Sequence, residues 1–181
     1  MSRFPKPYAD AVARLRVPFG FLLIAAFVWL SHPTVNSLWY GLPVALGGLV
    51  LRAWATGHLE KNIQLVVSGP YTYVRNPLYL GTLIAAAGFA AASRSWVLAL
   101  IFAAVFGLVY LPVIELEEQH LRELFPSYDD YAERVPMLLP VWRKAQAKRR
   151  FRWLLYRRNE EYNALLGFLA GVAVLLWKVL R

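Results

Sequence analysis

The feature that most constrains the fold of this chain is a set of apolar blocks separated by short polar and long basic connections. The blocks are residues 17–30, 38–55, 78–92, 96–114 and 164–176. Of the 181 residues, 59% are hydrophobic and 17% are charged, against about 45–50% and 25% in soluble domains. The pattern predicts an all-α, polytopic transmembrane helical bundle of about five spans, with residues 1–181 forming one membrane domain.

The blocks differ in length and in composition. Several are shorter than the roughly 20 residues that cross a hydrocarbon core, but aromatic and basic flanks can extend them by a turn. The first block has a basic flank, as a signal peptide would, yet Ser31-His32-Pro33 offers no small-residue cleavage site, so we expect a retained span. The third block contains small residues, which predict close approach of a neighbouring helix. These are Gly81, Ala85, Ala86, Ala87 and Gly88.

Lysine and arginine counts predict the orientation of the spans. The N-terminal arm carries four basic residues, the connection 56–77 two and the connection 117–162 ten, whereas 31–37 carries none and 93–95 one. Basic connections stay inside, so we predict an integral protein of a bacterial inner membrane with a cytoplasmic N-terminus. Residues 56–77 and 115–140 are then cytoplasmic and are the segments in which we look for catalytic residues, and 141–161 is a basic juxtamembrane segment.

The charge pattern also limits the partners. Residues 143–158 include eight basic side chains and no acidic one, interleaved with Phe151, Trp153, Leu154 and Leu155. In a chain this apolar, the net charge of +9 favours contact with the anionic membrane leaflet over nucleic acid. The chain has no cysteine, which excludes thiol chemistry, and its three widely spaced histidines argue against a metal site. The oligomeric state is not predicted by any of these features.

The connection before the third block contains the first candidate site. Asn76-Pro77 predicts a helix start, because Asn can cap a helix and Pro suits its first turn. The free amides of that start would face the cytoplasmic boundary, where they can hold a carboxylate or a ribose oxygen. Tyr71, Tyr73 and Tyr79 bracket this helix start. Taken alone, each tyrosine is better explained as a membrane anchor, whereas three of them around one helix start also indicate a site, so both interpretations stay open.

The second candidate site follows the fourth block. If the helix continues past the interface, Glu117 and Leu121 share one face, and Glu118 lies about 100° away beside Arg122. Carboxylates at a membrane edge are costly to bury and are often functional. A solvated helix end explains the pair equally well.

Together, the two segments resemble the isoprenylcysteine carboxyl methyltransferase family, which is related to the membrane phospholipid N-methyltransferases. The first half of the motif reads Ser68-Gly69-Pro70-Tyr71-x-Tyr73-x-Arg75-Asn76-Pro77-x-Tyr79-x-Gly81. The second half reads Glu117-Glu118-x-x-Leu121-x-x-x-Phe125-x-x-Tyr128-x-x-Tyr131-x-x-x-Val135-Pro136. The resemblance covers residues 55–140, and its two halves occur in the family's order and spacing.

The resemblance implies a transmembrane enzyme that uses S-adenosyl-L-methionine, held in a cytoplasmic pocket, to methylate a lipidic or small hydrophobic acceptor. The acceptor would be an isoprenylcysteine-type carboxylate or a phospholipid amine. Carried over by position, the cofactor contacts are Gln64, Leu65, Val66, Tyr71, Asn76, Pro77, Leu78, Tyr79 and Glu117. An amine acceptor needs a base, for which Glu118 and His120 are candidates, and Arg134 and His58 are further candidates for a catalytic role.

The chain departs from the family's pattern at three places. Asn76 stands where the family commonly has His, and Val113 stands where the eukaryotic enzymes have a substrate-side Arg. A basic tail and a fifth apolar block follow the motif. Two other functions remain: an NADPH-dependent membrane reductase of the steroid reductase type, and a non-catalytic membrane scaffold.

Overall fold

The computed structural model describes residues 4–141 and 150–181, and every regular element within them is helical. This confirms the predicted all-α class. The elements are α1 (Lys6–Leu30), α2 (Val35–Thr56), the 3-10 turn η1 (Gly69–Thr72), α3 (Pro77–Ser93), α4 (Trp96–Val105), the π-helical turn η2 (Phe106–Tyr110), α5 (Leu111–Leu124), α6 (Tyr128–Arg134), α7 (Trp153–Arg158) and α8 (Tyr162–Leu180).

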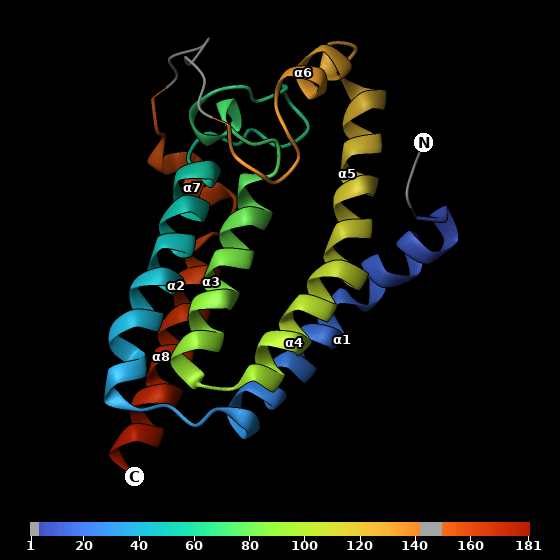
Figure 1. The fold of residues 1–181 in the computed structure, drawn as a ribbon. Coiled ribbons are helices and arrows are strands. Elements are labelled where there is room, and N and C mark those ends of the chain that lie inside the picture. Colours follow the sequence, from blue (N-terminus) through green and yellow to red (C-terminus); the bar gives the residue numbers. More distant parts are fainter. Residues whose placement is uncertain (1–3, 142–149) are drawn as a thin grey trace.

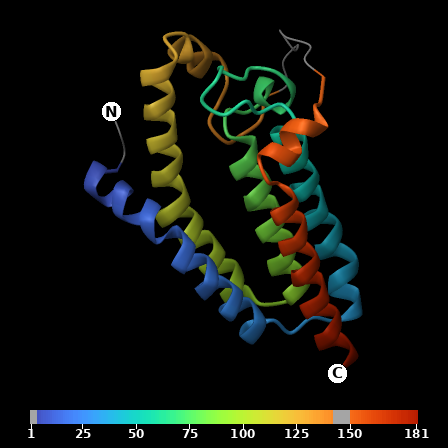
Figure 2. The same ribbon diagram turned by 180° about the vertical axis from the view of Figure 1, so that it is seen from behind.

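The long helices form two arms that diverge from a common base (Figure 1). α2, α3 and α8 make one arm, and α1 lies along α4 and α5 in the other, as the opposite view also shows (Figure 2). The base, here called the lower end, contains the α1–α2 and α3–α4 connections and the C-terminus. The upper end contains the connection from α2 to α3 together with α6 and α7.

Membrane-spanning capacity differs among the helices. α2, the continuous Trp96–Leu124 helix and α8 are long and apolar enough to cross a membrane. In α1, the segments Lys6–Leu15 and Pro18–Leu30 are bent by 56°, and they count as a further span if taken together. α3 has 17 residues, about 25 Å of helix against a core of about 30 Å. The integral membrane character follows, while the count of five spans stays a prediction.

α2 and α3 pack closely because glycines line their contact. A Cβ added at Gly48 would lie 2.4 Å from the Gly81 carbonyl oxygen, and one added at Gly88 would lie 2.3 Å from the Ala45 amide nitrogen. Backbones approach this closely only where no side chain intervenes. The close helix approach predicted from the small residues of the third block is confirmed, with α2 as the partner.

The short connection at residues 93–95 predicts a helical hairpin of the third and fourth apolar blocks. The tight turn is present, but the two helices do not pack together along their length (Figure 1). Arg94, at φ 53°, makes the tight turn between α3 and α4. Beyond this turn the two helices separate, because the glycine surface of α3 faces α2 while α4 and α5 lie along α1 (Figure 1).

The second arm contains a break in regular α-helix at η2. Pro112 has no N–H to donate to the Leu108 carbonyl four residues earlier, and the Tyr8 hydroxyl donates to that carbonyl at 2.7 Å. Val12 is buried beside Val109 and Val113. These contacts hold α1 against the turn where α4 passes into α5. The helix then continues to Leu124, so the condition under which Glu117 and Leu121 share one helix face is met.

The chain returns to the upper end of α2 after residue 150. The Arg152 amide donates to the Gly57 carbonyl at 2.9 Å, and the Asn159 side chain donates to the carbonyls of Thr56 and Leu59. Residues 142–149 of the predicted basic juxtamembrane segment lie outside the described residues. In the described part, Leu155 is buried while Trp153 and Leu154 are exposed, and their contact with a membrane surface stays a prediction.

Candidate active site

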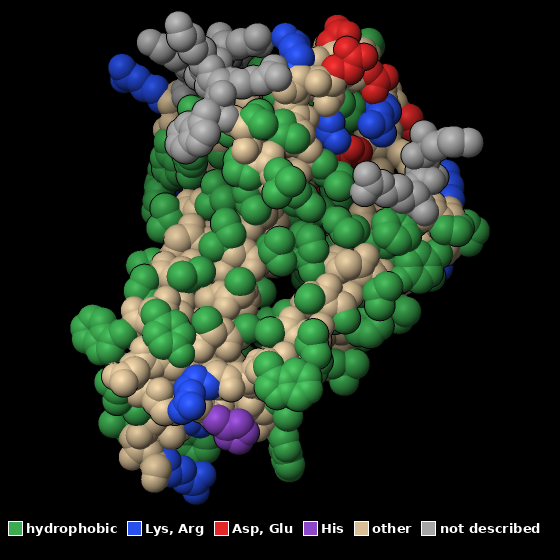
Figure 3. Space-filling model, viewed as in Figure 1, with side chains coloured by type: hydrophobic (Ala, Val, Ile, Leu, Met, Phe, Trp, Pro, Cys, Tyr) green, Lys and Arg blue, Asp and Glu red, His purple; other side chains and the backbone are tan. Residues whose placement is uncertain are grey.

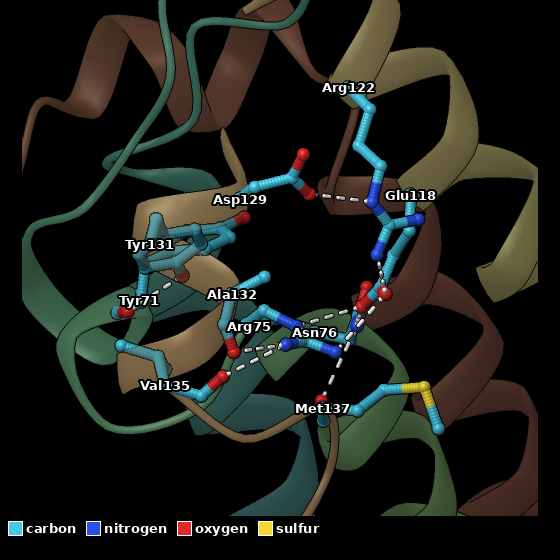
Figure 4. Close-up of polar contacts among 10 residues, drawn as sticks. All are labelled: Tyr71, Arg75, Asn76, Glu118, Arg122, Asp129, Tyr131, Ala132, Val135 and Met137. Atoms are coloured by element: carbon cyan, nitrogen blue, oxygen red, sulfur yellow. Dashed lines mark hydrogen bonds and ion pairs between the residues drawn. The ribbon is translucent and has the colours of Figure 1, made fainter. Parts of the chain in front are cut away.

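The centre of the upper end is the buried carboxylate of Glu118, on α5. Its two oxygens accept from Nε and Nη2 of Arg75 at 3.0 and 3.1 Å, as Figure 4 shows. Its side chain is 6% exposed and that of Arg75 is 14% exposed. Asn76 donates to the same carboxylate at 2.9 Å, and Arg122 lies 3.8 Å away. Donors on both of its oxygens fix this carboxylate in position.

Asn76 occupies the N-cap position of α3, but its side chain does not cap the helix. The expectation that it would do so is wrong, because the amide donates instead to Glu118 and, at 3.3 Å, to the Met137 carbonyl. Pro77 begins the helix as predicted. The amides of Leu78 and Tyr79 lie in the first turn, where no helical carbonyl precedes them.

Arg75 also joins the helix start to the segment after α6. Its Nη1 donates to the carbonyls of Ala132 and Val135 at 2.6 and 3.2 Å, which satisfies carbonyls at the end of α6. Its backbone amide donates to the Pro136 carbonyl at 2.9 Å. One guanidinium therefore ties α5, α6 and the start of α3 together (Figure 4).

Glu117 differs sharply from its neighbour. It is exposed, and its Oε1 accepts from the Tyr79 hydroxyl at 2.9 Å. The Tyr79 ring meets the Tyr110 ring edge-on, with centroids 5.9 Å apart. An accessible carboxylate and two aromatic rings therefore lie next to the first turn of α3.

Tyr71 lies beneath this surface, packed with Ala55 and Val66. Burial raises the pKa of its hydroxyl well above the ordinary value, and the negative charges of Glu117 and Glu161 raise it further. The Tyr131 hydroxyl donates to the Tyr71 carbonyl at 2.8 Å (Figure 4), and burial also raises the pKa of Tyr131. Both phenols are therefore neutral hydrogen-bonding groups at physiological pH.

The other predicted cofactor contacts divide between two clusters. Val66 is buried beside Tyr71, whereas Leu65 packs against Tyr128, Tyr131 and Val135. Gln64 donates to the Glu60 carboxylate. Leu65 and Val66 therefore pack against the buried tyrosines, and Gln64 is held by Glu60.

The remaining candidates are His120, Arg134 and His58. His120 is exposed on α5, and Arg134 is exposed on α6, where its Nε donates to the Asp130 carbonyl at 2.9 Å. His58 is buried at the end of α2, with Nδ1 2.9 Å from the Trp54 carbonyl.

Sequence reasoning missed a second buried ion pair. Arg52 on α2 donates from Nε and Nη2 to Glu161 at 2.7 and 3.0 Å, and from Nη1 to the Thr82 hydroxyl at 2.6 Å. The Glu161 side chain is 4% exposed. Arg52 lies inside an apolar block, where an arginine requires a counter-charge. The sequence therefore indicates that Arg52 has an acidic partner, but it does not identify a partner 109 positions away.

Chemically, the upper end combines a helix N-terminus that no side chain caps with an accessible carboxylate and aromatic faces. The helix start favours an anionic group, Glu117 favours a cationic one, and the tyrosine rings favour an apolar or cationic surface. The set suits a ligand that carries both an ammonium and a carboxylate. Within the described residues, no group of three or more His, Cys, Asp or Glu side chains could hold a metal ion.

Comparisons with known proteins connect this site to a family. The sequence model of the family described as phospholipid methyltransferase matches residues 15–127. The chain is 29% identical over 142 residues, 75% of its length, to the protein-S-isoprenylcysteine O-methyltransferase of Schizosaccharomyces pombe, of which 60% is covered. No solved structure gives a match.

Two further relatives are named for metal resistance. The chain is 35% identical over 152 residues to the nickel-cobalt-cadmium resistance protein NccN of Alcaligenes xylosoxydans xylosoxydans, covering 82% of this chain and 65% of the relative. It is 34% identical over 114 residues to the cobalt-zinc-cadmium resistance protein CzcN of Cupriavidus metallidurans, covering 62% and 51%. The chain thus spans between half and two thirds of these relatives.

Proposed function

Because the chain belongs to the phospholipid methyltransferase family, we propose that it transfers a methyl group from S-adenosyl-L-methionine to a lipidic or small hydrophobic acceptor. The observation that carries this proposal is the placement of the accessible Glu117 carboxylate beside the uncapped first turn of α3. These two elements lie 38 residues apart in sequence and meet through the Tyr79 hydroxyl.

The donor set fits the cofactor's charges. Glu117 would accept from the ammonium or the ribose hydroxyls, and the amides of Leu78 and Tyr79 would hold the carboxylate. The rings of Tyr79 and Tyr110 would cover the cationic and apolar parts. When bound, the cofactor supplies an electrophilic methyl group on a sulfonium. The task of this chain's residues is then to align the acceptor and to exclude water. This proposal includes a closed pocket at the upper end that holds the cofactor.

The contacts of Glu118 argue for positioning rather than for proton transfer. Arg75 and Asn76 engage both of its oxygens, and a general base needs a free oxygen within reach of the acceptor's proton. His120, the other candidate base, is exposed on α5. We therefore propose an acceptor that attacks as an anion, such as a carboxylate, over an amine that must lose a proton.

The fold suits an acceptor that comes from the membrane. Transmembrane helices would bring an apolar acceptor to the upper end, where a water-borne cofactor can enter. The basic residues of the long connections at this end support a cytoplasmic location in a bacterial inner membrane, with the N-terminus also cytoplasmic. The metal resistance named for two relatives is a property of those proteins.

Cofactor retention tests the proposal directly. Purified full-length protein in lipid nanodiscs is incubated with labelled S-adenosyl-L-methionine or labelled NADPH, and the retained label is counted. We expect retention of the first only, lost in Glu117→Ala and Tyr79→Ala and kept in Glu123→Ala, an exposed carboxylate on the same helix. Retention of NADPH instead would support the reductase function, and retention of neither would favour the scaffold.

The acceptor is identified by where the label goes. Membranes containing the protein are incubated with methyl-labelled cofactor, and lipids and proteins are separated. A carboxylate acceptor gives a methyl ester that mild base hydrolyses, whereas an N-methyl group survives the same treatment. A base-stable label would contradict the preference for a carboxylate.

A further inference from the structure

A groove at the lower end lies outside the methyl-transfer site. It has a volume of about 490 Å³ and runs between α3 and α4, from the turn that joins them up to Leu83. Figure 3 shows the surface hollowed between the arms. Its lining includes Leu83, Ala87 and Ala91 on α3 and Ala99, Phe102 and Ala103 on α4. The groove is thus apolar along its length and is built by helices that belong to the membrane region.

The groove has the length of one leaflet. Leu83 marks its deep end, and Arg94, which also lines it, marks its mouth. Eleven residues of helix separate them, which is about 16 Å. Half of a hydrocarbon core of about 30 Å is nearly the same length. An extended acyl chain of the leaflet at the lower end therefore matches the groove.

The mouth of the groove is basic. The Arg94 side chain is exposed and makes no hydrogen bond or ion pair with the described residues. Lys178 and Arg181 lie at the same end of the bundle. None of the 11 Asp and Glu residues falls within 30–36, 91–97 or 176–181, the segments that form this end. In the view of Figure 3, the acidic side chains gather at the upper end instead.

We propose that this groove binds an anionic phospholipid of the leaflet opposite the candidate active site, with one acyl chain between α3 and α4 and its phosphate on Arg94. Charge complementarity favours this occupant over a second copy of the chain. A parallel dimer about a twofold axis along the membrane normal would bring two basic lower ends together without an acidic side chain to offset them. A phosphate supplies the missing negative charge.

Native mass spectrometry of the purified full chain tests the proposal with two probes, dioleoyl phosphatidylglycerol and dioleoyl phosphatidylcholine. The lipids share their acyl chains and differ in net charge. We expect the wild type to retain the anionic lipid in preference, and Arg94→Asn to lower that preference about fivefold. Asn is chosen because it tolerates the positive φ of Arg94. Arg181→Asn, at the same end but outside the groove lining, is the matched control.

Substitutions that fill the groove test whether an acyl chain occupies it. Ala99→Phe and Ala87→Phe should each reduce retention of both lipids, while Gly47→Phe, on an exposed face of α2 with nothing within 4 Å of its added Cβ, should not. Thermal unfolding identifies any variant that fails to fold. If one groove variant fails, lipid retention by the other one tests the acyl-chain site.

Three outcomes would overturn the proposal. The first is equal retention of both lipids by the wild type, and the second is an unchanged preference in Arg94→Asn. The third is a wild-type dimer that Ala99→Phe dissociates, which would assign the groove to a second copy. Loss of cofactor binding has no bearing on these measurements, because Glu117 and the groove lie at opposite ends of the bundle.

Discussion

Arg75 and Glu118, 43 residues apart in sequence, form a bidentate ion pair with N–O distances of 3.0 and 3.1 Å. The pair joins the segment before α3 to the extension of α5, and it leaves Glu117 on the accessible side of the helix. Adjacent carboxylates thereby have different roles: one fixes the geometry of the upper end, and the other is available to a ligand.

Removing the buried partner should destabilise the protein. Glu118→Ala leaves the Arg75 guanidinium buried without its counter-charge, which should lower the free energy of unfolding by about 3–5 kcal/mol. Unfolding in mixed detergent micelles measures the change. Glu123→Ala, exposed on the same helix, should change it by less than about 0.5 kcal/mol. Equal effects of the two substitutions would contradict a structural role for the pair.

Glu117→Gln should weaken cofactor binding without destabilising the protein. The residue is exposed, so the free energy of unfolding should stay within about 0.5 kcal/mol of the wild type. Affinity for S-adenosyl-L-methionine should fall about tenfold or more, because a hydrogen bond to a charged group is worth about 1.5–3 kcal/mol. Equilibrium dialysis measures the affinity. A stable protein with unchanged affinity would remove Glu117 from the cofactor site.

The Arg52–Glu161 pair should anchor the start of α8. Glu161→Ala removes two hydrogen bonds to a guanidinium that is 25% exposed, and we expect a loss of about 1.5–3 kcal/mol, toward the lower figure because of that exposure. Limited proteolysis should then cut faster within residues 150–161. The control is Glu160→Asn, because Glu160 is exposed and Asn tolerates its φ of 54°. Faster cutting in the control alone would point to backbone strain instead.

The α2–α3 contact should reject even one methyl group. A Cβ at Gly48 would lie 2.4 Å from the Gly81 carbonyl oxygen, so Gly48→Ala should cost about 1–3 kcal/mol or more. The neighbouring Gly47 has nothing within 4 Å, and Gly47→Ala should stabilise the helix by up to about 1 kcal/mol. Thermal unfolding of the two variants gives opposite signs if the helices pack as described.

Alkaline pH should destabilise the upper end. The pKa values of Tyr71, Tyr128 and Tyr131 are raised, chiefly by burial. Above pH about 10 the unfolded chain releases these protons while the folded protein keeps them, so the stability present below that pH declines as pH rises. Tyr131→Phe should make the decline shallower, whereas Tyr40→Phe, at an exposed position, should not. A pH-independent free energy of unfolding between pH 9 and 11 would contradict this.

Much of the fold could be predicted because the signals are local. Apolar blocks of helical length predicted the long helices, and proline chemistry predicted that α3 begins at Pro77. The continuation of α5 past the apolar block was considered only as a condition, and the structure meets it. The predicted capping by Asn76 was wrong because its side chain is directed instead to a distant carboxylate, Glu118.

The sequence by itself determined that this is a helical membrane chain with two candidate segments, and the resemblance of those segments connected them to one chemistry. Only the tertiary structure decided which of Glu117 and Glu118 is buried, and that Arg52 finds its counter-charge in Glu161. The physical reason is that periodicity and proline act within a few residues. The rotation of each helix about its own axis is set by packing against neighbours, such as the glycine contact of α2 with α3, and that rotation decides which side chains meet.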